Sequence, residues 1–142
     1  MIEIVPFKAE HVLEIEQQEQ LLNELAHVPQ EYYKRLELKK WQYTIKIHNK
    51  IQACCGVVEF WKNRAECWAM IDKCSGSTFL PLTRTILKIY DSIDCDRIEA
   101  TVRCDFKAAN RFAKLLGFNL EVNEMKKYGV DGSSYALYAK VR

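Results

Sequence analysis

The sequence lacks long hydrophobic runs. None of its apolar stretches approaches the roughly 20 residues that a membrane-spanning helix requires, so we expect no membrane association. Residues 1–5 also lack the basic segment and the long apolar core of a secretory signal peptide. These absences predict a soluble protein, and the expected location is the cytoplasm.

Paired metal-binding motifs are missing as well. The chain has 6 cysteines and 3 histidines; no two cysteines form a C-x-x-C pair, and the histidines are scattered through the first third. This spacing does not favour a zinc site, so no metal is expected. Several cysteines fall in apolar runs, where a free thiol packs like a small hydrophobic side chain. We expect these cysteines to be reduced and structural, as is usual in a cytosolic protein.

A strong charge of one sign is also absent. The formal net charge is +2, and lysine and arginine are spread along the chain, so no clustered basic face argues for nucleic-acid binding. Basic residues do gather in the C-terminal half. They are explained most simply as a solvated surface and, second, as a site for an anionic cofactor: Arg97, Arg103, Lys107, Arg111 and Lys114.

The pattern that is present predicts one α+β domain over residues 1–142. We expect a central mixed, mostly antiparallel sheet of about seven strands, flanked by about four helices. The predicted strands are 1–7, 41–47, 51–61, 64–71, 97–103, 120–128 and 134–141. The predicted helices are 8–26 (one long or two broken), 31–39, one beginning near Ser77 to Phe79, and one that follows Asp105. Gly56 is a candidate bulge or close-approach point within its strand.

The stretch 67–90 organises the chain. Residues 67–71 form an apolar run typical of a buried strand, and the small polar residues that follow cannot continue it. Leu82, Ile86, Ile89, Tyr90 and Ile93 then fall on one helical face, and Pro81 fits best in the first turn of that helix. A loop at a helix N-terminus offers unpaired N–H groups, so it could bind a phosphate or serve only as a turn.

The helix that follows Asp105 has its own start and stop signals. The carboxylate of Asp105 can cap it, and Gly117 fits the left-handed residue that ends it. Its expected buried face consists of Ala108, Ala109, Phe112, Leu115 and Leu116.

Two motifs, together with the element order, resemble the GNAT superfamily of acyl-CoA-dependent N-acetyltransferases. The family's pyrophosphate loop, Q/R-x-x-G-x-G/A, corresponds to Lys73-Cys74-Ser75-Gly76-Ser77-Thr78, with Lys73 and Thr78 as departures. The family's helix N-x-x-A-x-x-L-Y-x-x-L-G-F corresponds to residues 106–118, where Ala109, Leu116, Gly117 and Phe118 match. Phe106 replaces the family's Asn and Ala113 its Tyr, although Asn110 lies one turn later on about the same face. The chain is most similar to small, divergent GNAT-like proteins of tailed bacteriophages.

The resemblance implies an acetyl-CoA-dependent N-acetyltransferase that acts on a primary amine of a small molecule or protein. It implies that backbone N–H groups near Met70 and Ile71 polarise the thioester carbonyl. Acetyl-CoA would be held by Lys73, Ser75, Gly76, Ser77 and Thr78 around the pyrophosphate, with Asn110 on the later helix.

Glu66 is the first candidate for the general base, because flanking apolar residues can raise its pKa. Its other interpretation is an outward residue paired with a nearby Lys or Arg. Glu59 is the second candidate, and a water relay the third. Tyr135 and Tyr138 are candidates for the acid that the family's Tyr supplies, or for sheet packing.

An alternative function fits the departure at Ala113 and the departures in the glycine loop at Lys73 and Thr78. On this interpretation the chain is a non-catalytic GNAT-fold protein, a phage virion, assembly or interaction factor, which either keeps CoA binding or has lost it. If phage-encoded, it would work in the host cytoplasm. The amine acceptor and the oligomeric state, including a possible homodimer, stay open.

Overall fold

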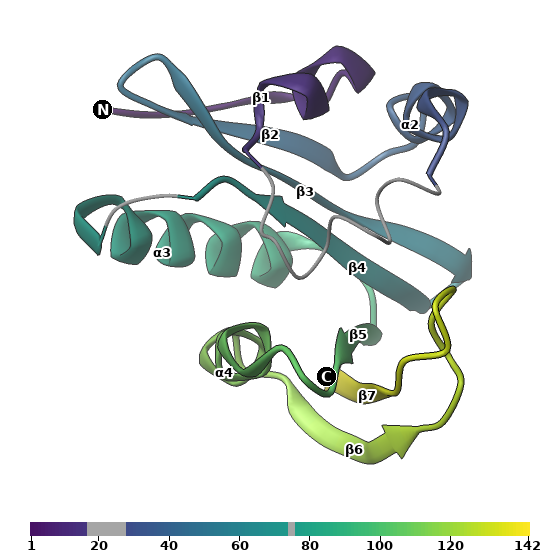
Figure 1. Ribbon diagram of the computed structural model, residues 1–142. Coiled ribbons are helices and arrows are strands. Elements are labelled where there is room, and N and C mark those ends of the chain that lie inside the picture. The colour runs from purple at the N-terminus through teal and green to yellow at the C-terminus, as the bar shows by residue number, and fades with distance from the viewer. Residues whose placement is uncertain (17–27, 74–75) are drawn as a thin grey trace.

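The computed structural model describes residues 1–16, 28–73 and 76–142. Its strands form one seven-stranded sheet in the order β1-β2-β3-β4-β5-β7-β6, with helices on both faces (Figure 1). Within the described chain, neighbouring strands are antiparallel except for the parallel pair of β4 and β5. The expected α+β class and the mixed, mostly antiparallel sheet are therefore confirmed.

Most strand bounds lie within one residue of the expected ones, whereas β6 and α2 each end three residues before the expected position. The strands are β1 Ile2–Pro6, β2 Gln42–Ile47, β3 Lys50–Trp61, β4 Arg64–Ile71, β5 Arg97–Arg103, β6 Asn119–Met125 and β7 Tyr135–Val141. The helices are the 3-10 helix η1 Ala9–Glu14 and the α-helices α2 Gln30–Leu36, α3 Gly76–Ser92 and α4 Lys107–Leu115. Among the residues described, these helices include none with the length and apolar character that crossing a membrane requires.

Two apolar clusters hold the layers together, one on each face of the sheet. Helices α3 and α4 cover one face, and alternate residues of the strands, such as Ala65, Ile98 and Ala100, pack against them. The shorter η1 and α2 cover part of the other face, where Trp68 and Met70 of β4 belong to the second cluster. Consecutive residues of β4 therefore face different layers.

Helix α3 begins at Gly76 and runs to Ser92. The predicted face is confirmed, because Leu82, Ile86, Ile89, Tyr90 and Ile93 are all buried. Pro81 lies in the second turn rather than the first, since the helix starts slightly before the expected position. Thr83 and Thr85 bond back to the carbonyls of Phe79 and Pro81 around this turn.

Helix α4 corrects two expectations. The carboxylate of Asp105 bonds the guanidinium of Arg103 at 3.1 Å and 3.2 Å, and Phe106 is the N-cap residue without a side-chain cap. The buried face is also rotated: Ala113 is buried, whereas Leu115 is 61% exposed and Ala108 is exposed. Gly117 does end the helix with a positive φ of 88°, as predicted.

The predicted helix over 8–26 is confirmed only in its first part. Residues Ala9–Glu14 form a 3-10 helix, and Ile15 is extended with φ −95° and ψ 127°. One continuous helix is therefore excluded, while residues 17–27 lie outside those described.

Gly56 is a close-approach point, as one of its two interpretations predicted. A Cβ at this position would lie 2.1 Å from Oε1 of Gln42 and 2.5 Å from the backbone oxygen of Trp41. Oε1 of Gln42 in turn accepts a hydrogen bond of 2.6 Å from the indole N–H of Trp68. Gly56 thus makes room for the side chain that orients Trp68.

Candidate active site

Strands β4 and β5 separate part of the way along their length. They pair in parallel from Arg64 and Arg97 to Glu66 and Glu99. Both strands are fully described, yet β4 continues to Ile71 and β5 to Arg103 without further pairing between them. The result is an opening in the sheet that starts immediately after Glu66 and Glu99.

Backbone groups of β4 line one side of this opening. The N–H of Asp72 donates to the carbonyl of Gln52, so the alternate residue Met70 also turns toward β3, where it pairs with Cys54. Ile71 and Ala69, being out of phase, turn their backbone groups toward the opening. Backbone donors near Met70 and Ile71 were predicted for the thioester carbonyl. Of these two residues, Ile71 is therefore the one whose N–H faces the opening between β4 and β5.

Four residues separate the end of β4 from the first turn of α3 in the sequence. Gly76, Ser77 and Thr78 form this turn, while Ser75, also predicted to bind the cofactor, lies outside the described residues. A Cβ at Gly76 would meet nothing within 4 Å, so the surface there is open. Nζ of Lys73 is half-exposed and lies 4.0 Å from a carboxylate oxygen of Glu16.

Asn110 joins α4 to the end of β5. Its amide nitrogen donates to the carbonyls of Arg103 at 2.9 Å and Phe106 at 2.8 Å, and its oxygen accepts from the Tyr138 hydroxyl at 2.7 Å. The side chain thus bonds protein groups, and its role as a cofactor ligand stays a prediction.

The carboxylate of Glu66 lies on the α2 face, at the last residue pair before the opening. It is half-buried, and no described residue forms an ion pair or hydrogen bond with it. Burial raises its pKa, the neighbouring Glu99 raises it further, and Arg64 opposes them. A carboxylate with a raised pKa, beside a gap in the sheet and without a partner among the described residues, is a stronger base than an ordinary glutamate and is suited to accept a proton.

A charge network next to Glu66 was missed by the sequence analysis. We use this term for Arg64, Arg97, Glu99 and Glu121. Glu99 accepts from Arg64 at 2.7 Å and 3.1 Å and from Arg97 at 2.7 Å, and Arg97 also reaches Glu121 at 2.6 Å. The hydrogen bond from Arg64 is the main cause that lowers the pKa of Glu99, and Arg97 adds to it.

The sequence contains part of the information needed to predict this network. Arg97 and Glu99 alternate along a predicted strand, which places both side chains on one face. Their proximity to Arg64 depends on the parallel register of β4 and β5, which the sequence does not reveal.

The other candidates for acid and base have protein partners. Glu59 lies 3.5 Å from Nζ of Lys40. Tyr138 is buried and its hydroxyl donates to Asn110. Tyr135 is buried as well, with its ring 5.2 Å from that of Tyr128. Glu66 is thus the candidate base that stays unpaired in the described chain.

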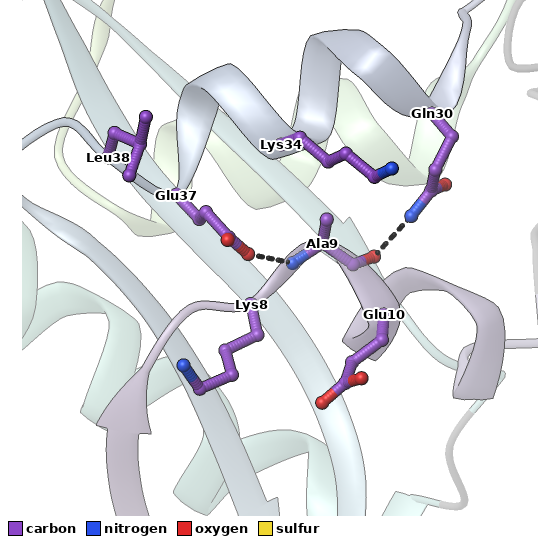
Figure 2. Close-up of a pocket in the computed structure, with 7 residues that line it drawn as sticks. All are labelled: Lys8, Ala9, Glu10, Gln30, Lys34, Glu37 and Leu38. Carbon is purple, nitrogen blue, oxygen red and sulfur yellow. Dashed lines mark hydrogen bonds between the residues drawn. The ribbon is translucent and has the colours of Figure 1, made fainter.

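A hollow in the surface is lined by residues of the η1 and α2 region rather than by residues of β4 or β5. It has a volume of about 640 Å³ and lies between η1 and α2 (Figure 2). Glu37 and Gln30 point into it but bond the backbone of Ala9, at 2.6 Å and 3.1 Å. These polar groups join η1 to α2, so we assign the hollow no chemistry.

The sequence itself matches nothing closely. No protein-family model matches the chain, and no curated protein matches it either.

Solved structures, however, match it over nearly its full length. An Ard1 protein from Thermoplasma volcanium superposes with a TM-score of 0.78 at 14% identity, over 99% of this chain and 97% of that one. A putative acetyltransferase from Salmonella typhimurium, solved with acetyl-CoA, gives 0.70 at 11% identity, over 99% and 93%. A ribosomal L7/L12 α-N-protein acetyltransferase in complex with coenzyme A gives 0.68 at 18% identity, over 99% and 93%. The fold is that of the GNAT acetyltransferases.

Proposed function

We propose that this protein is an N-acetyltransferase that transfers the acetyl group of acetyl-CoA to a primary amine. The observation that carries the proposal is the separation of β4 and β5 immediately after Glu66, with the first turn of α3 at the far end of β4. Structural neighbours solved with acetyl-CoA and with coenzyme A support it.

The residues around the opening suit acetyl-CoA. The N-terminal turn of α3 presents backbone N–H groups and the positive end of a helix dipole, which favour a pyrophosphate. The open surface at Gly76 leaves space for a phosphate beside the backbone. Gly76, Ser77 and Thr78 would hold that group, with Lys73 and Ser75 from the preceding loop and Asn110 from α4.

Acetyl-CoA supplies a thioester carbonyl that is open to attack by an amine. The backbone N–H of Ile71 faces the opening and is suited to stabilise negative charge on a carbonyl oxygen. Glu66 is suited to accept the proton that the amine must lose, because its carboxylate is unpaired and its pKa is raised. Ala113 has no acidic group for the departing thiolate, so a solvent proton is the simplest source.

One observation favours the alternative of a non-catalytic GNAT-fold protein, such as a phage virion or assembly factor. Ala113 is buried where the resemblance expects a Tyr, and the nearby Tyr138 donates its hydroxyl to Asn110. A protein of this kind would keep the fold and its stability without acetyl transfer.

Acetyl-CoA binding is the first requirement of the proposed function, and an assay for acetyl transfer to an amine then separates it from a non-catalytic protein that keeps CoA. We expect acetyl-CoA to raise stability by about 2.7 kcal/mol at a hundredfold excess over its dissociation constant, measured by thermal melting and calorimetric titration. Gly76→Trp should fold, since the added Cβ meets nothing within 4 Å, and should lose this binding. Lys88→Trp, at an exposed position further along α3, is the matched control and should bind normally. No stabilisation at millimolar acetyl-CoA would contradict the proposal.

A further inference from the structure

Two arginines and two glutamates occupy the first and the last of the residue pairs that β4 and β5 form with each other. Arg64 lies opposite Arg97, and Glu66 lies opposite Glu99. In-register neighbours of parallel strands point to the same face, so all four side chains lie on the α2 side of the sheet. In an even arrangement, each glutamate would pair with one arginine.

The observed arrangement is uneven. Glu99 receives Arg64 across the strands through two hydrogen bonds and Arg97 along its own strand through one. Glu66 receives neither, and no other described residue pairs with it. The carboxylate of Glu99 is only 6% exposed, so its negative charge depends on these two partners.

The separation of Arg64 and Glu66 along β4 does not explain why no hydrogen bond forms between them. Arg64 and Glu66 stand two residues apart on β4, as Arg97 and Glu99 do on β5. The β5 pair closes to 2.7 Å, so this spacing permits a hydrogen bond. The spacing therefore allows Arg64 to reach Glu66, but its guanidinium is bonded to Glu99 and lies over the rings of Phe60 and Trp61, at 4.7 Å and 4.6 Å.

We propose that Glu99 is a positioning residue for Glu66: by holding the guanidinium of Arg64, it keeps the Glu66 carboxylate unpaired where β4 and β5 separate. The consequence for catalysis rests on the proposed function. If Arg64 were released, it would pair with Glu66, stabilise its ionised form and block its access to the amine proton.

Within the described ranges, four titratable groups face or influence Glu66. Arg64 and Cys67 come from β4, Glu99 from β5 and Tyr32 from α2. Burial and Glu66 both raise the pKa of Tyr32, so this phenol stays neutral at physiological pH. Cys67 is likewise neutral, because burial raises the pKa of its thiol to about 12. Arg64 is the cation among these four groups.

The test is an NMR titration of the Glu66 carboxylate in the full chain, with its signal assigned from Glu66→Gln. Glu99→Asp keeps the negative charge but withdraws it toward β5, where Arg97 still reaches it and Arg64 does not. We expect the Glu66 midpoint to move to lower pH in this variant. The midpoint should return to the wild-type pH or above in Glu99→Asp/Arg64→Gln, because no guanidinium is left to pair. Glu99→Gln should behave like Glu99→Asp if it folds.

Arg97→Gln is the matched control. It removes a guanidinium from the same network but leaves the hydrogen bonds between Arg64 and Glu99, so the Glu66 midpoint should stay in place. An unchanged midpoint in Glu99→Asp, or a shift that persists without Arg64, would overturn the inference.

Activity provides a second readout. In Glu99→Asp we expect kcat/KM for acetyl transfer to fall about tenfold, as for the gain of one charge-assisted hydrogen bond, and to recover in the double variant. A wild-type protein without acetyl transfer would refute the proposed function while leaving the midpoint test of Glu99 intact. Conversely, active wild-type protein with an unmoved midpoint would refute only the role of Glu99.

Discussion

The two faces of the sheet use the same strands for different purposes. On the α3 and α4 face, β4 and β5 contribute apolar residues such as Ala65 and Ile98, which are fully buried. One residue further along each strand, on the α2 face, stand the carboxylates of Glu66 and Glu99. Among the described residues, the short η1 and α2 lie over part of this second face (Figure 1).

The difference between the two faces shows that residues that stabilise the fold and residues suited to proton transfer lie on opposite sides of the same strands. Apolar burial is non-directional and approximately proportional to area, so the fully packed face supplies most of the stabilisation. On the α2 face the same strands carry ionisable groups, and burial and neighbouring charges shift the pKa values of Glu66 and Glu99. Changes on the α3 and α4 face should therefore alter folding, and changes on the α2 face should alter proton transfer.

The largest effect is expected from Glu66→Gln. Amide substitution keeps the shape of the side chain but removes the proton acceptor, so kcat for acetyl transfer should fall by about 10²- to 10⁴-fold. Thermal melting should be close to that of the wild type, because no described residue forms an ion pair with Glu66. Glu59→Gln, on the neighbouring strand and paired with Lys40, is the control and should keep its activity. Equal losses in both variants would break the distinction between the faces.

On the opposite face, Ile98→Ala should act on folding. Ile98 is fully buried in the main cluster, so truncation leaves a cavity and should lower the free energy of unfolding by about 2–5 kcal/mol. Leu115→Ala is the matched control, since this exposed aliphatic residue of α4 should change stability by less than about 0.5 kcal/mol. Urea denaturation measures both, and similar losses would contradict the observed rotation of α4.

Gly56→Ala tests the close approach of Gln42 and Trp41 to β3 at Gly56. The new methyl would overlap Oε1 of Gln42 and the backbone oxygen of Trp41, and we expect a loss of about 1–3 kcal/mol in urea denaturation. Gln42→Ala in the same chain removes the first overlap but not the second. The double variant should therefore recover only part of the loss that Gly56→Ala causes on its own. Full recovery would mean that the backbone of Trp41 moves freely.

A smaller effect concerns acid stability on the α2 face. Arg64 and Arg97 lower the pKa of Glu99, so its contribution to stability is complete at neutral pH. That contribution is lost as the pH falls through the ordinary Glu range to the lowered folded-state pKa. The stability difference between wild type and Glu99→Gln should therefore narrow on acidification, in urea denaturation at a series of pH values. A constant difference would mean that the charge of Glu99 is irrelevant to folding.

The sheet was predictable because each strand carries its own signal. Alternation and apolar runs gave the bounds of β4 and β5 as residues 64–71 and 97–103, without knowledge of their neighbours. Gly117 was likewise readable, since a left-handed residue after a helix favours glycine. Local chemistry decides such features.

Features set by tertiary partners were not predictable. The rotation of α4 depends on what the helix packs against, so adjacent Leu115 and Leu116 gave no unique phase. Asp105 was expected to cap the helix, but Arg103 at the end of β5 takes its carboxylate. Glu66 was found from its position in the strand, whereas the partners that leave it unpaired depend on the register of β4 and β5.

The smallest effect is expected from Tyr138→Phe, which separates a structural hydroxyl from a catalytic one. The hydroxyl donates to Asn110 at 2.7 Å within the α3 and α4 layer, so its removal should cost about 1 kcal/mol of stability in urea denaturation. Burial raises the pKa of Tyr138, so the phenol holds its proton more tightly than usual and is a poor acid for a departing thiolate. Acetyl transfer should therefore stay within about twofold of wild type, because the change lies on the face that supplies stability. If kcat instead fell as far as in Glu66→Gln, Tyr138 would take the role of the family's missing Tyr, and chemistry would extend to both faces of the sheet.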